Sequence, residues 1–373
     1  MRAVIVSRVY ADPASRGKLK ALAGLGISVA AAVPERWAPT GVRGERQTSF
    51  GEDGGVRTVP VGVRGPTGPG TDPAWNTGAL RRLLSEFRPD LLQVEEEPWT
   101  RAAATAGLLA RRMRIPYFVL TRESLAQSHG LMGRLRRSRT LAGARGVVAA
   151  NGLAARLAVR DHPALPQRII PQLGTPLPLA GDRVRHTGLS IGFLGRLIPE
   201  KGLDLLFRAC VKLVGRWTIT VVGTGPAQEE LEGLAERLGI AGRVTWLGAL
   251  PRDQVEEIWP RLDCVVLPSR TAPRWIEATP RAALEAMAHG VAVISSAAGA
   301  LPELVEGTGI VVPEEDVAAL TEALQRLHDD PTVHQRLGGA GRRLIMDQHT
   351  DAAIAARTAA SGVRAFLQPV DIR

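Results

Sequence analysis

The chain alternates short apolar segments with helical segments along most of its length, and this alternation limits what it can fold into. Apolar, β-prone runs in the first half include "RAVIVS", "ISVAAAV", "VRTVPVGV", "DLLQV", "PYFVL" and "GVVAA". Segments with apolar residues at helical spacing, such as 77–87 and 99–114, lie between several of them. Strands that alternate with helices usually run parallel, because each helix carries the chain back across the sheet. We therefore expect an α/β protein whose parallel sheets are covered by helices on both faces.

The alternation pauses in a proline-rich segment, "IIPQLGTPLPLAGDRVRHTG", at residues 169–188. It then resumes with "LSIGFL", "WTITVVG", "RVTWLG", "DCVVLPS", "VAVISS" and "GIVVP". Because 373 residues exceed the size at which a single core stops growing, we expect two Rossmann-like domains joined by this segment. We place the first domain at 1–175 and the second at 188–350. A helix within 351–373 is expected to cross back to the first domain.

The net charge of +10 is unevenly distributed. Residues 1–185 carry 28 Lys and Arg against 14 Asp and Glu, a net charge of +14, whereas the remaining residues sum to −4. Such a basic half is expected to be attracted to polyanions or to anionic lipid. Its densest cluster, "GRLRRSRTLAGAR" at 133–145, is equally well interpreted as a solvated helix face. Nucleic acid is not an expected partner, because aromatic residues make up only 4% and no recognition motif accompanies the charge.

Segment lengths and cysteine usage argue against several classes of protein. No stretch reaches the roughly 18 to 20 apolar residues that a membrane span needs, and the first apolar run is too short for a signal peptide. Cys210 and Cys264 form neither a disulfide framework nor a metal-binding spacing. We expect a cytoplasmic protein, and peripheral contact with the inner face of the membrane is left open.

Residues suited to chemistry follow the ends of the predicted strands in the second half. "GRLIPEKG" at 195–202 follows the first of these strands and holds Arg196 and Lys201, and "GTGP" at 223–226 follows the second. The loop "SRTAPRWIEATPRAALEAMAHG" at 269–290 follows the fourth. In doubly wound domains, ligands bind beyond the carboxyl ends of the strands. The two cations suggest an anion site, and solvated surface charge is the alternative for each taken alone.

The third of these loops brings carboxylates close to the start of a helix predicted for "RAALEAMA". Thr279 can cap this helix and Pro280 suits its first position, which places free N–H groups near Glu277. Glu285 follows in the second turn of the helix. The two carboxylates are placed to hold hydroxyl groups at two ends of one ligand.

Three segments, "GRLIPEKGLDLL", "VVGTGP" and "EATPRAALEAMAHGVAVI", resemble the signature segments of retaining glycosyltransferase family 4. The resemblance is strong over residues 189–312 and rests in the first half on the strand–helix order and on "RPDLLQVEEEP". It implies the GT-B fold, in which two Rossmann-like domains face each other across a cleft. The first domain would bind a glycan or lipid-linked acceptor, and the second would bind a nucleotide-sugar donor, UDP- or GDP-linked. No further cofactor is implied.

The resemblance also implies roles for individual residues. Arg196 and Lys201 would bind the diphosphate, Glu277 the sugar hydroxyls and Glu285 the ribose, while the loops around residues 223–225 and 247–250 would border the base. The implied donor-site residues are Gly195, Arg196, Lys201, Gly223, Gly225, Leu250, Glu277, Ala278, Thr279, Pro280, Arg281 and Glu285. Arg196, Lys201 and Glu277 are expected to be catalytic. Because no Asp-x-Asp sequence occurs, a metal-independent mechanism is expected.

The chain departs from the family pattern in both halves. Thr279-Pro280 stands where many members have Phe-Gly, and Pro280 removes a backbone N–H that a sugar or phosphate oxygen could meet. In the first half, "RVYADPASRGKL" lacks the Gly-Gly turn that usually follows the first strand. "TRES" likewise replaces the His-Asp pair that often follows the strand corresponding to "PYFVL".

Candidates for acceptor or sugar contact therefore come from other residues of the first half. Glu123 or His129 is placed to touch a sugar, and Glu95 and Glu97 of "VEEEPW" follow a strand end where they could orient the acceptor hydroxyl. Strand-end acids are also often merely solvated. For the aromatic side chains of Trp37 and Trp99, core packing is expected rather than sugar stacking.

Two other functions fit the same residues. One is a non-catalytic subunit that binds sugar nucleotides beside an active partner, and the other is a GT-B sugar-nucleotide epimerase that needs no acceptor. An oxidoreductase is not expected, because "GTGP" lacks the longer G-x-G-x-x-G pattern and a ribose-binding acid about 20 residues later. The favoured interpretation is a retaining hexosyltransferase of polysaccharide biosynthesis.

Overall fold

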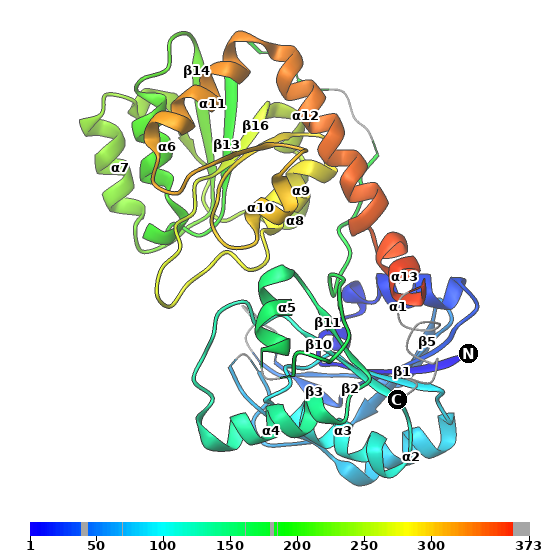
Figure 1. Ribbon diagram of the computed structural model, residues 1–373. Helices are drawn as coiled ribbons and strands as arrows, with labels where there is room; N and C mark the ends of the chain where they lie inside the picture. The colour runs from blue at the N-terminus through cyan, green and yellow to red at the C-terminus, as the bar shows by residue number, and fades with distance from the viewer. Residues whose placement is uncertain (39–43, 69, 161, 180–182, 185, 361–373) are drawn as a thin grey trace. The chain divides into compact units, whose positions relative to one another are not determined.

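The protein, seen in a computed structural model, forms two compact units (Figure 1). The structure describes residues 1–38, 44–68, 70–160, 162–179, 183–184 and 186–360. The first unit consists of Met1–Gly174 and the segment from Asp351, and the second consists of Thr175–Thr350. Of the segment predicted to cross back, residues 361–373 lie outside the described residues.

The first unit is built around one largely parallel sheet. Its strands are β1 (Arg2–Val6), β2 (Ser28–Pro34), β5 (Gly51–Asp53), β6 (Val56–Val61), β9 (Leu91–Val94), β10 (Tyr117–Thr121), β11 (Gly146–Ala149) and β12 (Gln167–Ile169). They lie in the order β12-β11-β10-β9-β1-β2-β6-β5, and only β5 is antiparallel to its neighbour. The chain builds the sheet outward from β1 to β6 and then from β9 to β12. The order therefore reverses between β1 and β9, where Val6 pairs with Val94.

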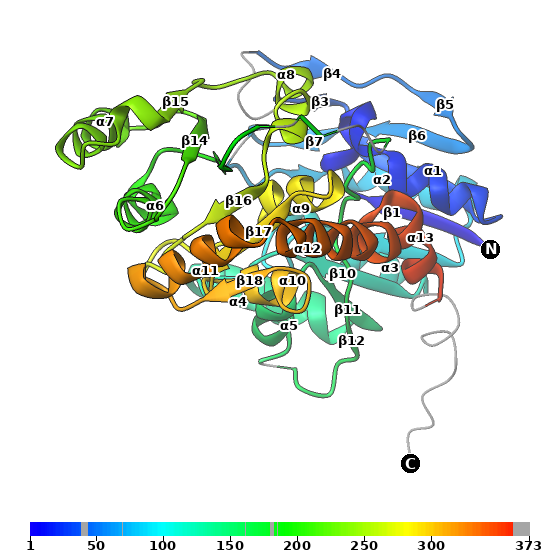
Figure 2. The same cartoon turned by 90° about the horizontal axis from the view of Figure 1, so that it is seen from above.

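Helices cover both faces of this sheet, as the predicted alternation requires. They are α1 (Gly17–Gly24), α2 (Thr77–Phe87), α3 (Arg101–Arg112), α4 (Gly130–Ala142), α5 (Gly152–Val159) and α13 (Asp351–Ala359). Apolar residues of α2 and α3 pack on one face, against side chains such as Val4 and Val94. Leu19 and Leu22 of α1 and Ala355 of α13 pack on the other face, against Ile5. Both views show α13 beside α1 (Figure 1, Figure 2).

Two short antiparallel pairs extend the loops of this unit. The pairs are β3 (Arg36–Trp37) with β4 (Arg46–Gln47), and β7 (Val63–Arg64) with β8 (Ala74–Trp75). Helices α2, α3 and α5 are capped at their N-termini by Asn76, Thr100 and Asn151 respectively. The side chain of each capping residue accepts a hydrogen bond from a free backbone N–H group in the first turn. These caps fix where the chain leaves each loop.

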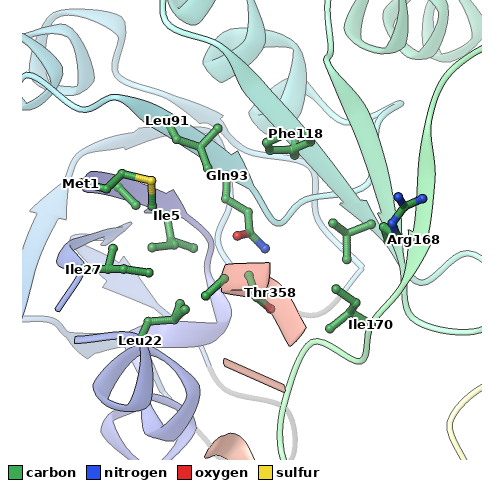
Figure 3. A pocket seen from close by; sticks show the side chains of 13 residues that line it. Met1, Ile5, Leu22, Ile27, Leu91, Gln93, Phe118, Arg168, Ile170 and Thr358 are labelled. Carbon is green, nitrogen blue, oxygen red and sulfur yellow. The ribbon is translucent and has the colours of Figure 1, made fainter. Parts of the chain in front are cut away.

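A largely apolar cavity lies on the face of the sheet that carries α1 and α13 (Figure 3). Apolar side chains, including Ile5, Leu22 and Phe118, line it together with the amide of Gln93. Several lining residues come from the first half of their strands, as Leu91 does in β9. Others, such as Ile170, follow the end of a strand, so the cavity runs along this face of the sheet.

The second unit has a fully parallel sheet. Its strands are β13 (Leu189–Leu194), β14 (Trp217–Val222), β15 (Val244–Trp246), β16 (Cys264–Leu267), β17 (Ala292–Ser296) and β18 (Ile310–Val312). Their order, β15-β14-β13-β16-β17-β18, is that of a Rossmann domain. Strands β13 and β16 meet at the reversal, where Ile191 pairs with Cys264.

Helices again form a layer on each face of the second sheet. They are α6 (Leu203–Cys210), α7 (Gln228–Arg237), α8 (Arg252–Glu256), α9 (Arg281–Ala288), α10 (Leu301–Val305), α11 (Val317–Asp329) and α12 (Pro331–Leu344). Helices α6, α7 and α11 pack on the face that carries Phe193 and Ile219. Helices α9 and α10 pack on the opposite face, against Val265 and Val293. Within the described residues, no helix combines the length and apolarity that crossing a bilayer requires.

The core position of α13 gives a stability test. Ile354 is fully buried against Leu120, Val148 and Ile170 of the first unit. We expect Ile354→Ala to lower the free energy of unfolding of this unit by about 2–5 kcal/mol, because it leaves a cavity in a packed core. Urea denaturation measures the change. The matched control is Ala356→Ser, which alters an exposed position of the same helix and should shift the value by less than about 0.5 kcal/mol. Equal stability of the two variants would contradict the packing described.

Candidate functional site

The carboxyl edge of the second sheet is shaped by close contacts between backbone segments. A Cβ atom added at Gly223, after β14, would lie 1.9 Å from the carbonyl oxygen of Gly195, after β13. One added at Gly225 would lie 2.2 Å from the carbonyl oxygen of Leu197. Gly223 also has a φ of 136°, which side-chain-bearing residues rarely adopt. Glycine is therefore required at both positions for these two loops to touch.

Lys201 and Glu277 meet at this edge from the two strands of the reversal. Lys201 Nζ lies 2.6 Å from Glu277 Oε2, and their side chains are 17% and 8% exposed. Ser269, directly beyond the end of β16, donates a 3.2 Å hydrogen bond to the same carboxylate oxygen. The ammonium group also lies 5.4 Å from the ring centre of Trp275. Lys201 is thus held in one place by a carboxylate and an aromatic face.

The loop that carries Glu277 is fixed by its backbone as well. The Glu277 carbonyl oxygen accepts a 2.7 Å hydrogen bond from the N–H of Ala300, in the loop after β17. A Cβ atom at Gly299, which has a φ of 59°, would lie 2.3 Å from that oxygen. Ser296 closes the arrangement by donating a 2.5 Å hydrogen bond to the carbonyl of Ser269. Three loops thereby converge around the Lys201–Glu277 pair.

Arg196 differs from Lys201 in having no ion pair with any described residue. Its side chain is exposed, one residue beyond Gly195 at the end of β13. Arg281 and Thr279 are also exposed, whereas Ala278 and Leu250 are half-buried. The edge therefore presents the solvent-facing guanidinium groups of Arg196 and Arg281 and the ammonium group of Lys201, which is paired with Glu277.

The start of α9 corrects one prediction from the sequence. Thr279 does not cap the helix, because Pro280 occupies the capping position and Arg281 is the first helical residue. The N–H of Arg281 donates to the backbone carbonyl of Thr279 at 2.8 Å, not to its hydroxyl. Pro280, with φ −77° and ψ 73°, makes this tight turn and is buried. The Thr279 hydroxyl is left at the surface.

Glu285 lies in α9, half-buried. No hydrogen bond or ion pair joins its carboxylate to another described residue. Burial raises the pKa of this carboxyl group, and the nearby charges of Arg281 and Arg252 only partly oppose that rise. A half-buried acid without a partner is costly to keep ionised, which is typical of positions kept for a ligand rather than for stability.

Several residues of this edge received no role from the sequence. They include Ser269 and Trp275, and also Arg270, which makes two 2.8 Å hydrogen bonds to the carboxylate of Asp204 in α6. Arg270 also bonds Glu315 at 3.1 Å. The available signal was a small polar residue and an arginine shortly after a buried strand, but the acidic partners of Arg270 lie 45 and 66 residues away along the chain.

Among the described residues, no group of three or more His, Cys, Asp or Glu side chains is arranged to hold a metal ion. Two histidines of the second unit, His186 and His334, lie 3.4 and 3.8 Å from Asp263. Asp263 precedes β16, so this cluster belongs to the opposite edge of the sheet from Lys201.

Polar side chains also gather at the carboxyl edge of the first sheet. One of them, Glu95, is enclosed by other residues of the first unit. The Glu95 side chain is fully buried and lies 2.5 Å from Lys18 Nζ. It also accepts hydrogen bonds from Tyr10, Gln93 and Gln172, at 2.7 to 2.9 Å. The expectation that Glu95 orients an acceptor hydroxyl is therefore not supported, because its oxygens are occupied by donors of its own unit.

Glu97 and its neighbour Glu96 are engaged in a similar way. Glu96 pairs with Arg8 at 2.6 Å, which joins the ends of β9 and β1 across the reversal of the sheet. Glu97 accepts hydrogen bonds from the Thr121 hydroxyl at 2.6 Å and from the N–H of Arg122 at 2.9 Å. Burial raises the pKa of Glu97 despite these bonds.

Glu123 and His129 form a further polar cluster at this edge. Glu123 Oε1 lies 2.6 Å from His129 Nε2, and Arg137 Nη1 lies 3.5 Å from the other carboxylate oxygen. The His129 ring stacks on Trp99, with centroids 4.3 Å apart. Trp99 therefore supports this pair, while Trp37 lies 5.9 Å from the guanidinium of Arg8. The structure brings the two candidates named from the sequence into direct contact.

Two family models match the chain. The model described as glycosyl transferases group 1 matches residues 183–344, and the one described as glycosyl transferase 4-like domain matches residues 13–172. A curated relative, GDP-mannose-dependent alpha-(1-6)-phosphatidylinositol monomannoside mannosyltransferase from Mycolicibacterium smegmatis, is 37% identical over 41% of this chain and 42% of its own length. The match thus spans less than half of that relative. 2-Deoxystreptamine N-acetyl-D-glucosaminyltransferase from Streptomyces fradiae is 29% identical over 72% of this chain and 70% of its own length.

Solved structures share the fold over nearly the whole chain. Sucrose-phosphate synthase from Thermosynechococcus elongatus matches with a TM-score of 0.67 and 21% identity, over 96% of this chain and 98% of its own. HepE from Anabaena, solved in complex with UDP and glucose, matches with a TM-score of 0.64 and 16% identity, over 96% and 98% of the two chains. The predicted architecture of two Rossmann-like halves with parallel sheets is confirmed.

The unpartnered carboxylate in α9 gives a pH-dependent prediction. Because the pKa of Glu285 is raised in the folded state, the ionised form destabilises the protein, fully so above the folded-state pKa. Glu285→Gln should therefore raise the free energy of unfolding at pH 7. The gain should fade as the pH falls and vanish below the ordinary glutamate pKa of about 4.3. Denaturant titrations at several pH values measure it. Glu306→Gln, at an exposed position, is the control, and an equal gain from it would refute the assignment.

Proposed function

The chain belongs to glycosyltransferase family 4, and we propose that it transfers a sugar from a nucleoside diphosphate donor to a hydroxyl group of a glycan or lipid-linked acceptor. The observation that carries the proposal is the placement of Lys201, Glu277 and Arg196 at the reversal between β13 and β16. Ligands of doubly wound sheets bind at this point. A cation pair here is suited to the diphosphate, and a carboxylate beside it is suited to sugar hydroxyls.

The two cations supply electrostatic stabilisation of the leaving group. When the bond between the sugar's anomeric carbon and the diphosphate breaks, the terminal phosphate oxygen gains negative charge. Fixed positive groups stabilise such charge most effectively when they are in place beforehand. Lys201 is held in place by Glu277 and Trp275, and exposed Arg196 is available to close on the phosphates. The N-terminus of α9 adds a partial positive charge.

The proposed reaction retains the configuration of the sugar. The acceptor hydroxyl attacks the face that the diphosphate leaves, a new bond forms between its oxygen and the anomeric carbon, and its proton passes to the departing phosphate oxygen. No side chain is assigned as a covalent nucleophile. The mechanism is proposed to be metal-independent, because Arg196, Lys201 and the helix terminus take the place that a divalent ion occupies in other transferases.

The remaining donor contacts follow from position in the second unit. Glu285 is proposed to bind the ribose, since its carboxylate has no partner among the described residues and it lies in the second turn of α9, whose preceding loop carries Glu277. The loops at Gly223–Gly225 and Leu247–Leu250, which are joined by the hydrogen bond from the N–H of Gly223 to the carbonyl of Gly248, are proposed to border the base. The relatives suggest both bases, since one is named as GDP-mannose-dependent and a solved neighbour contains UDP.

The acceptor is proposed to bind at the carboxyl edge of the first unit. The Glu123–His129 pair, stacked on Trp99, is the candidate for sugar contact there. Relatives are named for a phosphatidylinositol mannoside and for 2-deoxystreptamine, so both lipid-linked and free acceptors have support. A protein of this kind is expected in the cytoplasm, where nucleotide sugars are at hand, with access to the membrane if the acceptor is lipid-linked.

Replacing either cation tests the leaving-group assignment. Lys201→Ala and Arg196→Ala should each lower kcat by about 10²–10³-fold, because each removes one preorganised charge from the departing phosphate. Turnover is measured with the natural or a surrogate acceptor. Lys212→Ala removes an exposed lysine that follows α6 and serves as the matched control. Near-normal turnover in either of the first two variants would rule out the clamp.

Slow hydrolysis of the donor separates the enzyme from the two alternatives. The purified chain, given UDP- or GDP-sugars without an acceptor, should release the nucleoside diphosphate. A binding subunit would release none, and an epimerase would instead return an altered sugar nucleotide.

Thermal unfolding with UDP and GDP identifies the base, since a ligand at 100 times its Kd adds about 2.7 kcal/mol of stability. Stabilisation by neither nucleotide would contradict donor binding.

A further inference from the structure

Helix α4 (Gly130–Ala142) carries an apolar stripe on its solvent side. Leu131, Met132 and Leu135 are 79%, 58% and 39% exposed. Their spacing of three and four residues places them on one face of the helix. The opposite side of α4 is the one that packs, with Gly133, Thr140 and Leu141 buried. Three large apolar side chains gathered on one exposed face are unusual for a surface that meets only water.

The arginines of α4 fall into two groups. Arg136 and Arg137 turn inward, where they pair with Asp72 at 3.3 Å and with Glu123 at 3.5 Å. Arg134 and Arg139 are exposed and have no ion pair with any described residue. Arg134 lies three residues after Leu131, and Arg139 lies four residues after Leu135, so the free arginines flank the apolar stripe.

An apolar stripe bordered by unpaired arginines is typical of a helix that lies in a membrane interface. The apolar side chains enter the boundary of the acyl region, while the guanidinium groups meet anionic headgroups. The net charge of +14 over residues 1–185 complements the same partner. A nucleic acid would match the arginines but would leave Leu131, Met132 and Leu135 in water.

The position of α4 links this stripe to the acceptor edge. The helix begins directly after His129, whose ring contacts Glu123 at the end of β10. Leu131 and Met132 are thus in the first turn of α4, next to the polar cluster at the carboxyl edge of the first sheet. A bilayer in contact with this turn would present its headgroups beside that cluster.

We propose that the exposed face of α4, defined by Leu131, Met132, Arg134, Leu135 and Arg139, docks the protein on an anionic lipid bilayer. Docking itself follows from this surface alone, but its purpose, delivery of a lipid-linked acceptor to the first unit, rests on the proposed function. The two ideas are therefore tested by separate measurements: vesicle binding for the surface, and donor hydrolysis for the site.

The experiment uses sedimentation of the full chain with vesicles of phosphatidylcholine, either alone or with about 30 mol% phosphatidylglycerol. This composition places several anionic lipids under one helix. Wild-type protein should prefer the anionic vesicles by at least about tenfold. Arg134→Gln with Arg139→Gln should weaken this binding by about 20-fold, because each arginine near an anionic surface contributes about fivefold. Leu131→Ser with Met132→Ser should weaken it by about tenfold or more.

Matched controls remove the same groups elsewhere in the first unit. Arg81→Gln with Arg82→Gln deletes two exposed arginines of α2, and Leu25→Ser deletes an apolar side chain that is 55% exposed. Both controls should bind the anionic vesicles within about twofold of wild type. Donor hydrolysis should be unchanged in all four variants, since none of the altered residues belongs to the donor site.

Four results would overturn the proposal. The first is a wild-type protein with no preference for anionic vesicles. The second is an α2 variant that loses as much binding as the α4 arginine variant, which would indicate general electrostatic attraction. Unchanged binding by Leu131→Ser with Met132→Ser would remove the role of the stripe. A fall in thermal stability of that variant with vesicle binding intact would show that the stripe packs against protein. If hydrolysis fails in wild type while docking holds, only the proposed function is lost.

Discussion

The neighbouring placement of β13 and β16 is the constraint on which the second unit's chemistry depends. The strand order reverses there, so the loops that leave these two strands diverge and leave room beyond the sheet. Lys201 lies on one of these loops and Glu277 on the other, and their side chains meet at 2.6 Å beyond the end of the sheet. Glycines at 223 and 299 let the next loops on each side approach within backbone contact. A side chain at either position would push apart the segments that hold the pair.

The first unit also has a reversal of strand order, but the carboxylates beside it are engaged by residues of the same unit. Its reversal lies between β1 and β9, and the residues that follow these strands, Arg8 and Glu96, also form an ion pair. Glu95 is fully buried with donors on each oxygen, so it ties the sheet to Lys18 and Gln172. Removing one member would strand a buried charge, which is why such networks resist change. Further along the edge, Glu123 and His129 are also paired with each other.

Much of the fold could be predicted because each element is encoded locally. The helical spacing at 77–87 coincides with α2 (Thr77–Phe87), and the resemblance to glycosyltransferase family 4 is confirmed. The edge strand β12 was missed because its three residues are all exposed and show no apolar pattern. The burial and pairing of Glu95 could not be predicted, because two of its hydrogen-bond donors, Lys18 and Gln172, each lie 77 residues away in opposite directions along the chain. The prediction that Thr279 caps α9 was wrong, because the backbone turn at Pro280 moves the start of the helix by one residue.

The return of α13 to the first unit has a consequence for biosynthesis. Its residues, from Asp351, pack against α1 near the start of the chain and against strands that precede Gly174. During translation, the second unit emerges with all of its residues, Thr175–Thr350, before the first unit has its last helix. The first unit must wait on the ribosome with Leu120, Val148 and Ile170 uncovered by Ile354. Although domains commonly fold in order of synthesis, here the half that is made first is the half that is completed last.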